Sequence, residues 1–193
     1  MTYLIAGVPR SGKSQFSKQL SQKLNIARID FDDITTAFEA LVPEYGLFMT
    51  MDQDIREQKA YPIVESLINF YLQRKENLVI EGDNFDLQDW SKYKEICKNS
   101  LKMCVFGYGD ITPEKKIEIN SETTIEQICW FEPLSINEKI RIAQEMIDKS
   151  KKMRKEVDEI NDLNYIKYFE THPNFKNALE EAMGFCLEDR KPS

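Results

Sequence analysis

The sequence predicts an α/β protein in which a five-stranded parallel sheet is covered by helices on both faces, a three-layer α/β/α sandwich with a helical flap. Two observations carry this prediction. Five short apolar segments alternate with longer segments of helical periodicity along the 193 residues, and strands separated by helices form parallel sheets through right-handed crossovers. A glycine-containing loop also lies between the first strand and the first helix. We therefore expect a single domain spanning residues 1–193.

The loop at Gly7–Ser14 reads GVPRSGKS and has the spacing GxxxxGKS of a phosphate-binding loop. It follows the apolar run Tyr3–Ala6 and precedes Phe16, Leu20 and Leu24, which recur at helical spacing. A strand, a tight loop and the start of a helix are the context such a loop needs, because backbone N–H groups then converge on one anion. This context disfavours the alternative, a glycine-containing turn with a surface lysine.

Each fixed residue of the loop has a chemical role. Gly7 and Gly12 allow positive φ and close approach of the backbone to phosphate oxygens. Lys13 is expected to reach the β- and γ-phosphates, and the Ser14 hydroxyl to bind Mg²⁺. We therefore expect a nucleoside triphosphate, ATP or GTP, to bind with Mg²⁺. The residues expected to contact the nucleotide are Gly7, Val8, Pro9, Arg10, Ser11, Gly12, Lys13, Ser14 and Gln15.

The second and third expected strands are each followed by acidic residues. The strand Ile26–Ile29 precedes an acidic segment at residues 30–33, and the strand Leu78–Ile80 precedes a second at residues 81–83. Ligands of open parallel sheets bind outside the carboxyl ends of the strands. We therefore expect both acidic segments to face the phosphate-binding loop.

These acids suit phosphoryl transfer to a hydroxyl group, which needs a cation and a carboxylate that orients or deprotonates the acceptor. We expect Asp30 or Glu81 to hold Mg²⁺ together with Ser14, and Asp32 to contact the acceptor hydroxyl. Alternatively, Asp32 and Asp33 cap the helix that follows them.

A helix with a basic C-terminal half is expected after the capping box Ser135–Glu138. A flap that closes over bound nucleotide can deliver positive charge to the transferred phosphoryl group. We expect Arg141 to take this catalytic role, because it lies beside the apolar stripe of the helix, whereas the run Lys149–Lys155 reads as exposed. The alternative is a solvated basic face.

The remaining elements follow from apolar periodicity and from cap and turn residues. Two more strands are expected at Lys102–Tyr108 and Tyr165–Phe169. Pro62 is expected to start a new helix or to kink the helix that contains it, and Gly184 to end the last helix. The other helices are expected at residues 34–41, 52–75, 86–97, 112–121, 135–155 and 175–183.

The acidic composition narrows the classes of partner. The chain has 33 acidic and 26 basic side chains and a formal net charge of −7, whereas binders of nucleic acids and membrane surfaces are basic overall. The four cysteines are widely spaced and one histidine is present, which disfavours a structural zinc site and indicates a reducing compartment. No apolar run is long enough for a signal peptide or a membrane span. We expect a cytoplasmic protein with neither a membrane nor a nucleic acid as its partner.

The chain resembles the small P-loop kinases: the adenylate, shikimate and gluconate kinase group, the zeta-toxin and chloramphenicol phosphotransferase types, and bacterial proteins called adenylate-kinase-related or 2-phosphoglycerate-kinase-like. The resemblance rests on Gly7–Ser14, Asp30–Asp32 and Ile80–Gly82. It implies the P-loop NTPase fold, phosphate binding by Lys13, magnesium at Ser14 with Asp30, and acceptor contact at Asp32. Glu81-Gly82 stands where nucleotide-monophosphate kinases usually have Asp-Gly, and the paired flap arginines of several members are missing.

The expected function is that of an ATP- and Mg²⁺-dependent phosphotransferase acting on a hydroxyl or phosphate group of a small molecule. Within the single domain, we expect an acceptor-binding insertion at residues 40–75 and a flap at residues 112–158. An alternative is a nucleotide-binding regulator or slow NTPase that uses γ-phosphate occupancy to move the segment 134–155. A 5′-hydroxyl nucleic-acid kinase is a third reading, disfavoured by the acidic composition.

Overall fold

The computed structural model of the chain describes residues 1–83, 85–122 and 133–188. Its five strands form one sheet in the order β2-β3-β1-β4-β5, and each neighbouring pair is parallel. The predicted five-stranded parallel sheet is therefore confirmed. The strands are β1 (Thr2–Gly7), β2 (Ala27–Asp30), β3 (Leu78–Glu81), β4 (Leu101–Gly107) and β5 (Ile166–Glu170).

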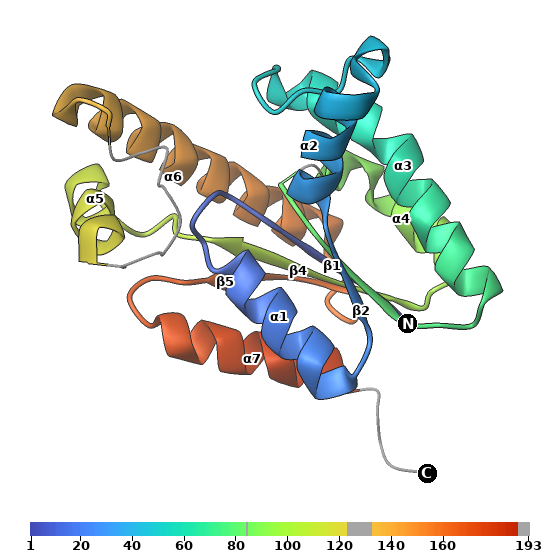
Figure 1. The fold of residues 1–193 in the computed structure, drawn as a ribbon. Coiled ribbons are helices and arrows are strands. Elements are labelled where there is room, and N and C mark those ends of the chain that lie inside the picture. Colours follow the sequence, from blue (N-terminus) through green and yellow to red (C-terminus); the bar gives the residue numbers. More distant parts are fainter. Residues whose placement is uncertain (84, 123–132, 189–193) are drawn as a thin grey trace.

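Helices cover both faces of this sheet. Within the described residues they are α1 (Lys13–Leu24), α2 (Phe31–Leu41), α3 (Gln53–Gln73), α4 (Trp90–Ile96), α5 (Pro113–Glu122), α6 (Ile136–Ile160) and α7 (Phe175–Leu187), with the short 3₁₀ helices η1 (Pro43–Tyr45) and η2 (Leu87–Asp89). In Figure 1, α1 and α7 lie on one face, and α3, α4 and α6 on the other. The predicted three-layer α/β/α arrangement is confirmed.

The central strand β1 shows how the sequence divides the core. All six of its residues are buried, as expected for a parallel strand covered on both faces. Tyr3 and Ile5 pack with Phe16 of α1 and Phe185 of α7, whereas Leu4 packs in the larger core under α3, α4 and α6. Alternate side chains of a strand point to opposite faces. Packing in these two apolar layers holds β1 in place and so sets the position of the loop that follows it.

Several elements differ in extent from the sequence-based expectations. α3 is continuous through Pro62, because Ala60, Val64 and Ile68 are buried on either side and their packing outweighs the hydrogen bond that proline removes. α6 extends beyond the basic run to Ile160. α7 passes through Gly184 and ends at Leu187.

The start of α2 also differs from the expected helix at residues 34–41. α2 begins at Phe31, because the Asp30 side chain accepts a hydrogen bond from the Asp32 backbone N–H, at 3.2 Å, and so caps the helix. The alternative interpretation, in which Asp32 and Asp33 cap this helix, is therefore wrong. By contrast, the capping box of Ser135 and Glu138 at the start of α6 is confirmed.

Other features fall in the core or outside the described residues. Cys97, Cys104 and Cys186 are buried free thiols, while Cys129 lies outside the described residues. In the part of the chain that the structure describes, no helix combines the length and the apolar character needed to cross a bilayer.

Candidate active site

The loop between β1 and α1 has a backbone that depends on its glycines. Gly7 has φ of +140°, and a Cβ placed there would lie 2.1 Å from the Phe106 carbonyl oxygen. Gly12 has φ of +91°, and a Cβ there would lie 2.3 Å from Cε2 of Phe175. A side chain at Gly7 is excluded by conformation and by the backbone of β4, and one at Gly12 is disfavoured by conformation and would displace the Phe175 ring. The loop therefore curls tightly and presents its backbone to the start of α1.

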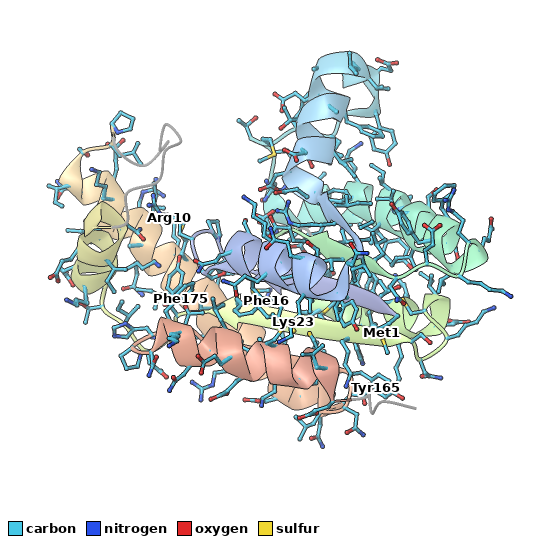
Figure 2. All side chains as sticks on the ribbon, turned by 60° about the horizontal axis from the view of Figure 1, so that its bottom comes forward. Met1, Arg10, Phe16, Lys23, Tyr165 and Phe175 are labelled. Carbon is cyan, nitrogen blue, oxygen red and sulfur yellow. The ribbon has the colours of Figure 1, made fainter. Side chains whose placement is uncertain are left out.

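The loop lies at the carboxyl edge of the sheet. Figure 2 shows Arg10 of the loop and Phe175 of α7 to the left, Met1 and Tyr165 further to the right, and Lys23 between them. Met1 and Tyr165 immediately precede β1 and β5. Figure 1 shows α2 and α3 on one side of the loop and α5 and α6 on the other. This edge is where parallel sheets bind their ligands.

Two side chains hold the outer turn of the loop. The Tyr108 hydroxyl donates to the Pro9 carbonyl at 2.8 Å, and the Lys116 ammonium donates to the Arg10 carbonyl at 3.1 Å. Lys116 also lies 3.7 Å from the centre of the Tyr108 ring. Burial and the nearby charge of Arg10 lower the pKa of Lys116 to about 8. Because the Arg10 guanidinium donates to the Asn120 carbonyl at 3.3 Å, its side chain is directed to α5.

Lys13 and Ser14, at the start of α1, lie where the sequence predicts them. The Lys13 ammonium donates to the Val8 carbonyl at 3.1 Å and so folds back across the loop. The Ser14 hydroxyl donates to Oε1 of Glu81 at 2.8 Å. Glu81, at the end of β3, is 2% exposed and also accepts a hydrogen bond from Ser17 at 3.3 Å. The structure therefore brings the predicted Ser14 and Glu81 into direct contact.

Arg28 of β2 joins this group, although the sequence analysis assigned it no role. Its guanidinium lies 2.9 Å from both Oδ2 of Asp30 and Oε1 of Glu81, and its Nε donates to Ser17 at 2.7 Å. Burial and the neighbouring Asp30 raise the pKa of Glu81 to about 7. The Arg28 charge at 2.9 Å favours the ionised carboxylate. Burial and Arg28 therefore act in opposite directions on the protonation of Glu81.

The oxygen atoms of Ser14 and Glu81 fit a magnesium ion bound to nucleotide phosphates. Mg²⁺ is usually held by one or two carboxylates together with phosphates and water. Asp30 and Glu81 both pair with Arg28, and Glu81 is the better candidate because it also accepts the hydrogen bond of the Ser14 hydroxyl. Within the described ranges, no group of three or more His, Cys, Asp or Glu side chains is arranged as a metal site.

The ion pair of Arg28 with Glu81 leads to a prediction about stability. Replacing Arg28 with methionine is expected to lower the free energy of unfolding by about 3 kcal/mol, because it leaves Glu81 buried and uncompensated. The folded-state pKa of Glu81 is raised above its unfolded value of 4.5. Ionisation of Glu81 therefore lowers the free energy of unfolding as the pH rises from 4.5 to about 7. Urea unfolding should show a larger loss at pH 8 than at pH 5.

A surface arginine provides the control for this experiment. Arg74 pairs with Glu76, and both side chains are about half exposed. Replacing Arg74 with methionine is expected to cost less than about 1 kcal/mol at either pH. An equal loss at pH 5 and pH 8 in the Arg28 variant would show that the loss does not come from the charge of Glu81.

Asp32 lies in the first turn of α2, which follows directly on the end of β2. Its pKa is raised to about 6, first by burial and then by Asp83 and Asp30, while Lys13 and Arg56 lower it. The Asp32 residue is nevertheless exposed to solvent. A carboxylate with this pKa can accept a proton near neutral pH. Asp32 and Lys13 are thus close enough to influence each other electrostatically, as the sequence predicts.

Asp83 and Arg56 form a second charged group beside Asp32. Arg56 of α3 is 7% exposed, and its guanidinium lies 3.0 Å from Oδ2 of Asp83. It also donates to the Gln53 side chain at 2.9 Å and to the Met49 carbonyl at 3.2 Å. These contacts attach α3 to the segment after β3 and place one wall of the site.

The cation that α6 presents to this region is Lys149. Burial lowers the pKa of Lys149, Asp83 and Glu57 raise it, and Lys13 and Arg56 lower it. These groups come from the loop, from α3 and from the segment after β3, so Lys149 faces all three. Arg141, the expected flap cation, is instead about two-thirds exposed and pairs with Glu145 one helical turn away. The structure does not bring Arg141 to the other predicted site residues.

Two of the residues that the sequence analysis missed had a detectable signal. Arg28 is two positions before Asp30, so both side chains lie on the same face of β2. Lys149 lies three residues after Met146 and four before Met153, on a stripe that is at least half buried. In each case the periodicity of the element predicts the direction of the side chain.

The sheet order, the loop and its contacts define a P-loop NTPase fold of the kind found in small kinases. A gluconokinase from Sinorhizobium meliloti 1021 is similar over 97% of this chain and 91% of its own, with 12% identity and a TM-score of 0.57. A shikimate kinase from Bacteroides thetaiotaomicron is similar over 97% of both chains, with 14% identity and a TM-score of 0.57. No family model and no curated protein matches the chain in sequence. At these identities the similarity concerns the fold.

Proposed function

We propose that the protein is an ATP- and Mg²⁺-dependent kinase that phosphorylates a hydroxyl group of a small molecule. The observation that supports this proposal is that the Lys13 charge acts on Asp32, while Ser14, next to Lys13, donates a hydrogen bond to Glu81 at the end of β3. A nucleotide site alone needs the loop and its metal ligands. Transfer to a second substrate also uses a carboxylate that orients or deprotonates the acceptor hydroxyl, and Asp32, whose pKa is raised to about 6, could serve as that group.

The chain's own groups have separate roles in this reaction. The backbone of Gly7–Ser14 and the Lys13 ammonium hold the β- and γ-phosphates. Asp32 orients the acceptor hydroxyl and takes its proton while the hydroxyl oxygen attacks the γ-phosphorus and ADP leaves. Bound Mg²⁺ would neutralise phosphate charge and would be held by Ser14 and Glu81. We assign the flap role to residues 112–158 and acceptor binding to the region of residues 40–75.

An assay for acceptor-dependent product tests the proposal. The protein is incubated with γ-labelled ATP, Mg²⁺ and a pooled extract of small metabolites, and both labelled products and ADP are measured. We expect label in a small molecule and ADP formation that depends on the extract. ADP formation that no acceptor stimulates would instead support a slow NTPase or a nucleotide-dependent regulator.

Lys149 is proposed to stabilise the negative charge of the phosphoryl group in transfer, because it faces Lys13 and the acceptor side. Replacing Lys149 with methionine is expected to lower kcat by about 10²-fold, the loss typical of one such cation or donor. The affinity for ATP, measured by titration calorimetry, should change little, since Lys13 and the loop backbone remain.

Two other variants of α6 make this prediction specific. Lys152 pairs with Glu156 and is about two-thirds exposed, so Lys152→Met should retain full activity. Arg141→Met tests the expectation from sequence that Arg141 is the flap cation. A large loss for Arg141→Met with none for Lys149→Met would assign the role to Arg141 and remove it from Lys149.

A further inference from the structure

The charges around Asp32 limit the kind of acceptor that this site can bind. Arg56 of α3 lies near Asp32, and its positive charge lowers the pKa of Asp32. An arginine here would ordinarily recognise a carboxylate or phosphate of the ligand through its forked N–H groups. The question is therefore whether the Arg56 guanidinium is free to bind a carboxylate or phosphate of the acceptor.

The chain itself occupies the guanidinium of Arg56. One terminal nitrogen donates to the Met49 carbonyl, and the other donates to Gln53 and to Oδ2 of Asp83. The remaining nitrogen, Nε, is enclosed by protein and has no hydrogen-bond partner among the described residues. Because the Arg56 side chain is 8% exposed and paired with Asp83, an anionic ligand would have to compete with Asp83 for the guanidinium. Displacement of Asp83 would leave its carboxylate, whose side chain is 14% exposed, without its partner.

Carboxylates outnumber cations on the walls next to the loop. Gln53 donates to both Glu57 and the Asp83 carbonyl, and this holds Glu57 beside the pair. The carboxylates are Asp32, Glu57 and Asp83, and the cations apart from the phosphate-binding Lys13 are Arg56 and Lys149. Oδ1 of Asp83 is also enclosed and accepts no hydrogen bond from the described residues. Of the two wall cations, Arg56 is paired with Asp83, and Lys149 is the one proposed above to act on the transferred phosphoryl group, so the groups left for the acceptor are mainly hydrogen-bond acceptors.

We infer that the acceptor is a hydroxyl-rich molecule without an anionic group, either neutral or carrying an amine. Hydroxyl and ammonium groups donate hydrogen bonds, which Asp32 and Glu57 can accept without breaking the Arg56–Asp83 pair. A carboxylated or phosphorylated acceptor would meet an excess of negative charge. This inference rests on the proposed kinase function.

Fractionation of the acceptor pool by charge tests the inference. An extract of small metabolites is separated on an anion-exchange resin into anionic and non-anionic fractions. Each fraction is incubated with the full-length protein, γ-labelled ATP and Mg²⁺. Transfer of label to a compound from the non-anionic fraction supports the inference. Transfer mainly to the anionic fraction, or equally to both, overturns it while the kinase function stands. Transfer to neither, although ATP binds, refutes the kinase function and the inference with it.

A variant that releases Arg56 provides a second test. Asp83→Asn keeps the size of the side chain and removes its charge. With the loop saturated by Mg²⁺ and a non-hydrolysable ATP analogue, inorganic sulfate should bind the variant at least about tenfold more tightly than the wild type. Asp54→Asn, an exposed position on α3, is the matched control and should not change sulfate binding. Equal sulfate affinity in the wild type and a folded Asp83→Asn protein would show that Asp83 does not mask Arg56.

Discussion

Replacing Lys13 with methionine is expected to reduce kcat/KM for phosphoryl transfer by about 10²–10³-fold, the loss typical of one group that stabilises transition-state charge. Of the two cations in the loop, Arg10 is directed to α5, whereas the Lys13 ammonium crosses the loop to the Val8 carbonyl. Methionine keeps much of the length of the side chain and removes the charge. Initial rates of ADP formation at several ATP concentrations measure the effect.

The matched control for this variant is a lysine on the same helix. Lys18 is exposed and lies more than one turn along α1 from the loop, so Lys18→Met should leave the rate unchanged. Both variants should unfold at a temperature close to that of the wild type, because neither lysine is part of the core. Full activity in the Lys13 variant would refute the assignment of the loop as the nucleotide site.

Replacing Asp32 with asparagine is expected to lower the rate of acceptor phosphorylation by about 10²–10⁴-fold, the contribution of a positioned general base. ATP binding should be retained, because Asp32 lies on α2 and outside the loop. The wild-type rate should also fall as the pH drops below about 6, since the pKa of Asp32 is raised to about 6 and only the ionised form accepts a proton. Rates of labelled product formation between pH 5 and pH 8 measure this dependence.

Asp33→Asn is the control for this prediction, because Asp33 is an exposed carboxylate next in sequence. Its activity and pH profile should match those of the wild type. The raised pKa of Asp32 also implies that its ionisation disfavours the folded state as the pH rises above the unfolded value of 3.8. The Asp32→Asn protein should therefore be no less stable than the wild type at pH 7. A large loss of stability would show that the residue acts structurally.

The sheet and the loop could be predicted from the sequence because their signals are local. Buried parallel strands read as short apolar runs, and the glycine spacing of Gly7–Ser14 belongs to one structural context. The boundaries of helices were predicted less well. Asp30 rather than Asp32 or Asp33 caps α2, since the chain leaves β2 one residue later than the apolar pattern indicates.

The partners of the charged side chains could not be predicted from local patterns. Arg28 meets Glu81 across 53 residues, and Arg56 meets Asp83 across 27. Whether a cation is free to bind a ligand depends on these contacts. The same reason explains why Lys149 faces the site, whereas Arg141, two turns earlier on α6, is exposed.

The sequence by itself determined that a glycine loop with a lysine and a serine follows the first strand of a parallel sheet, with acids at the ends of two other strands. Those properties depend on residues near each other in the chain. The tertiary structure decided which of these acids are neutralised: Glu81 and Asp30 by Arg28, and Asp83 by Arg56. Ion pairs form between side chains that only the packing of β2, β3 and α3 brings within hydrogen-bond distance, and that packing leaves Asp32 without an ion-pair partner among the described residues.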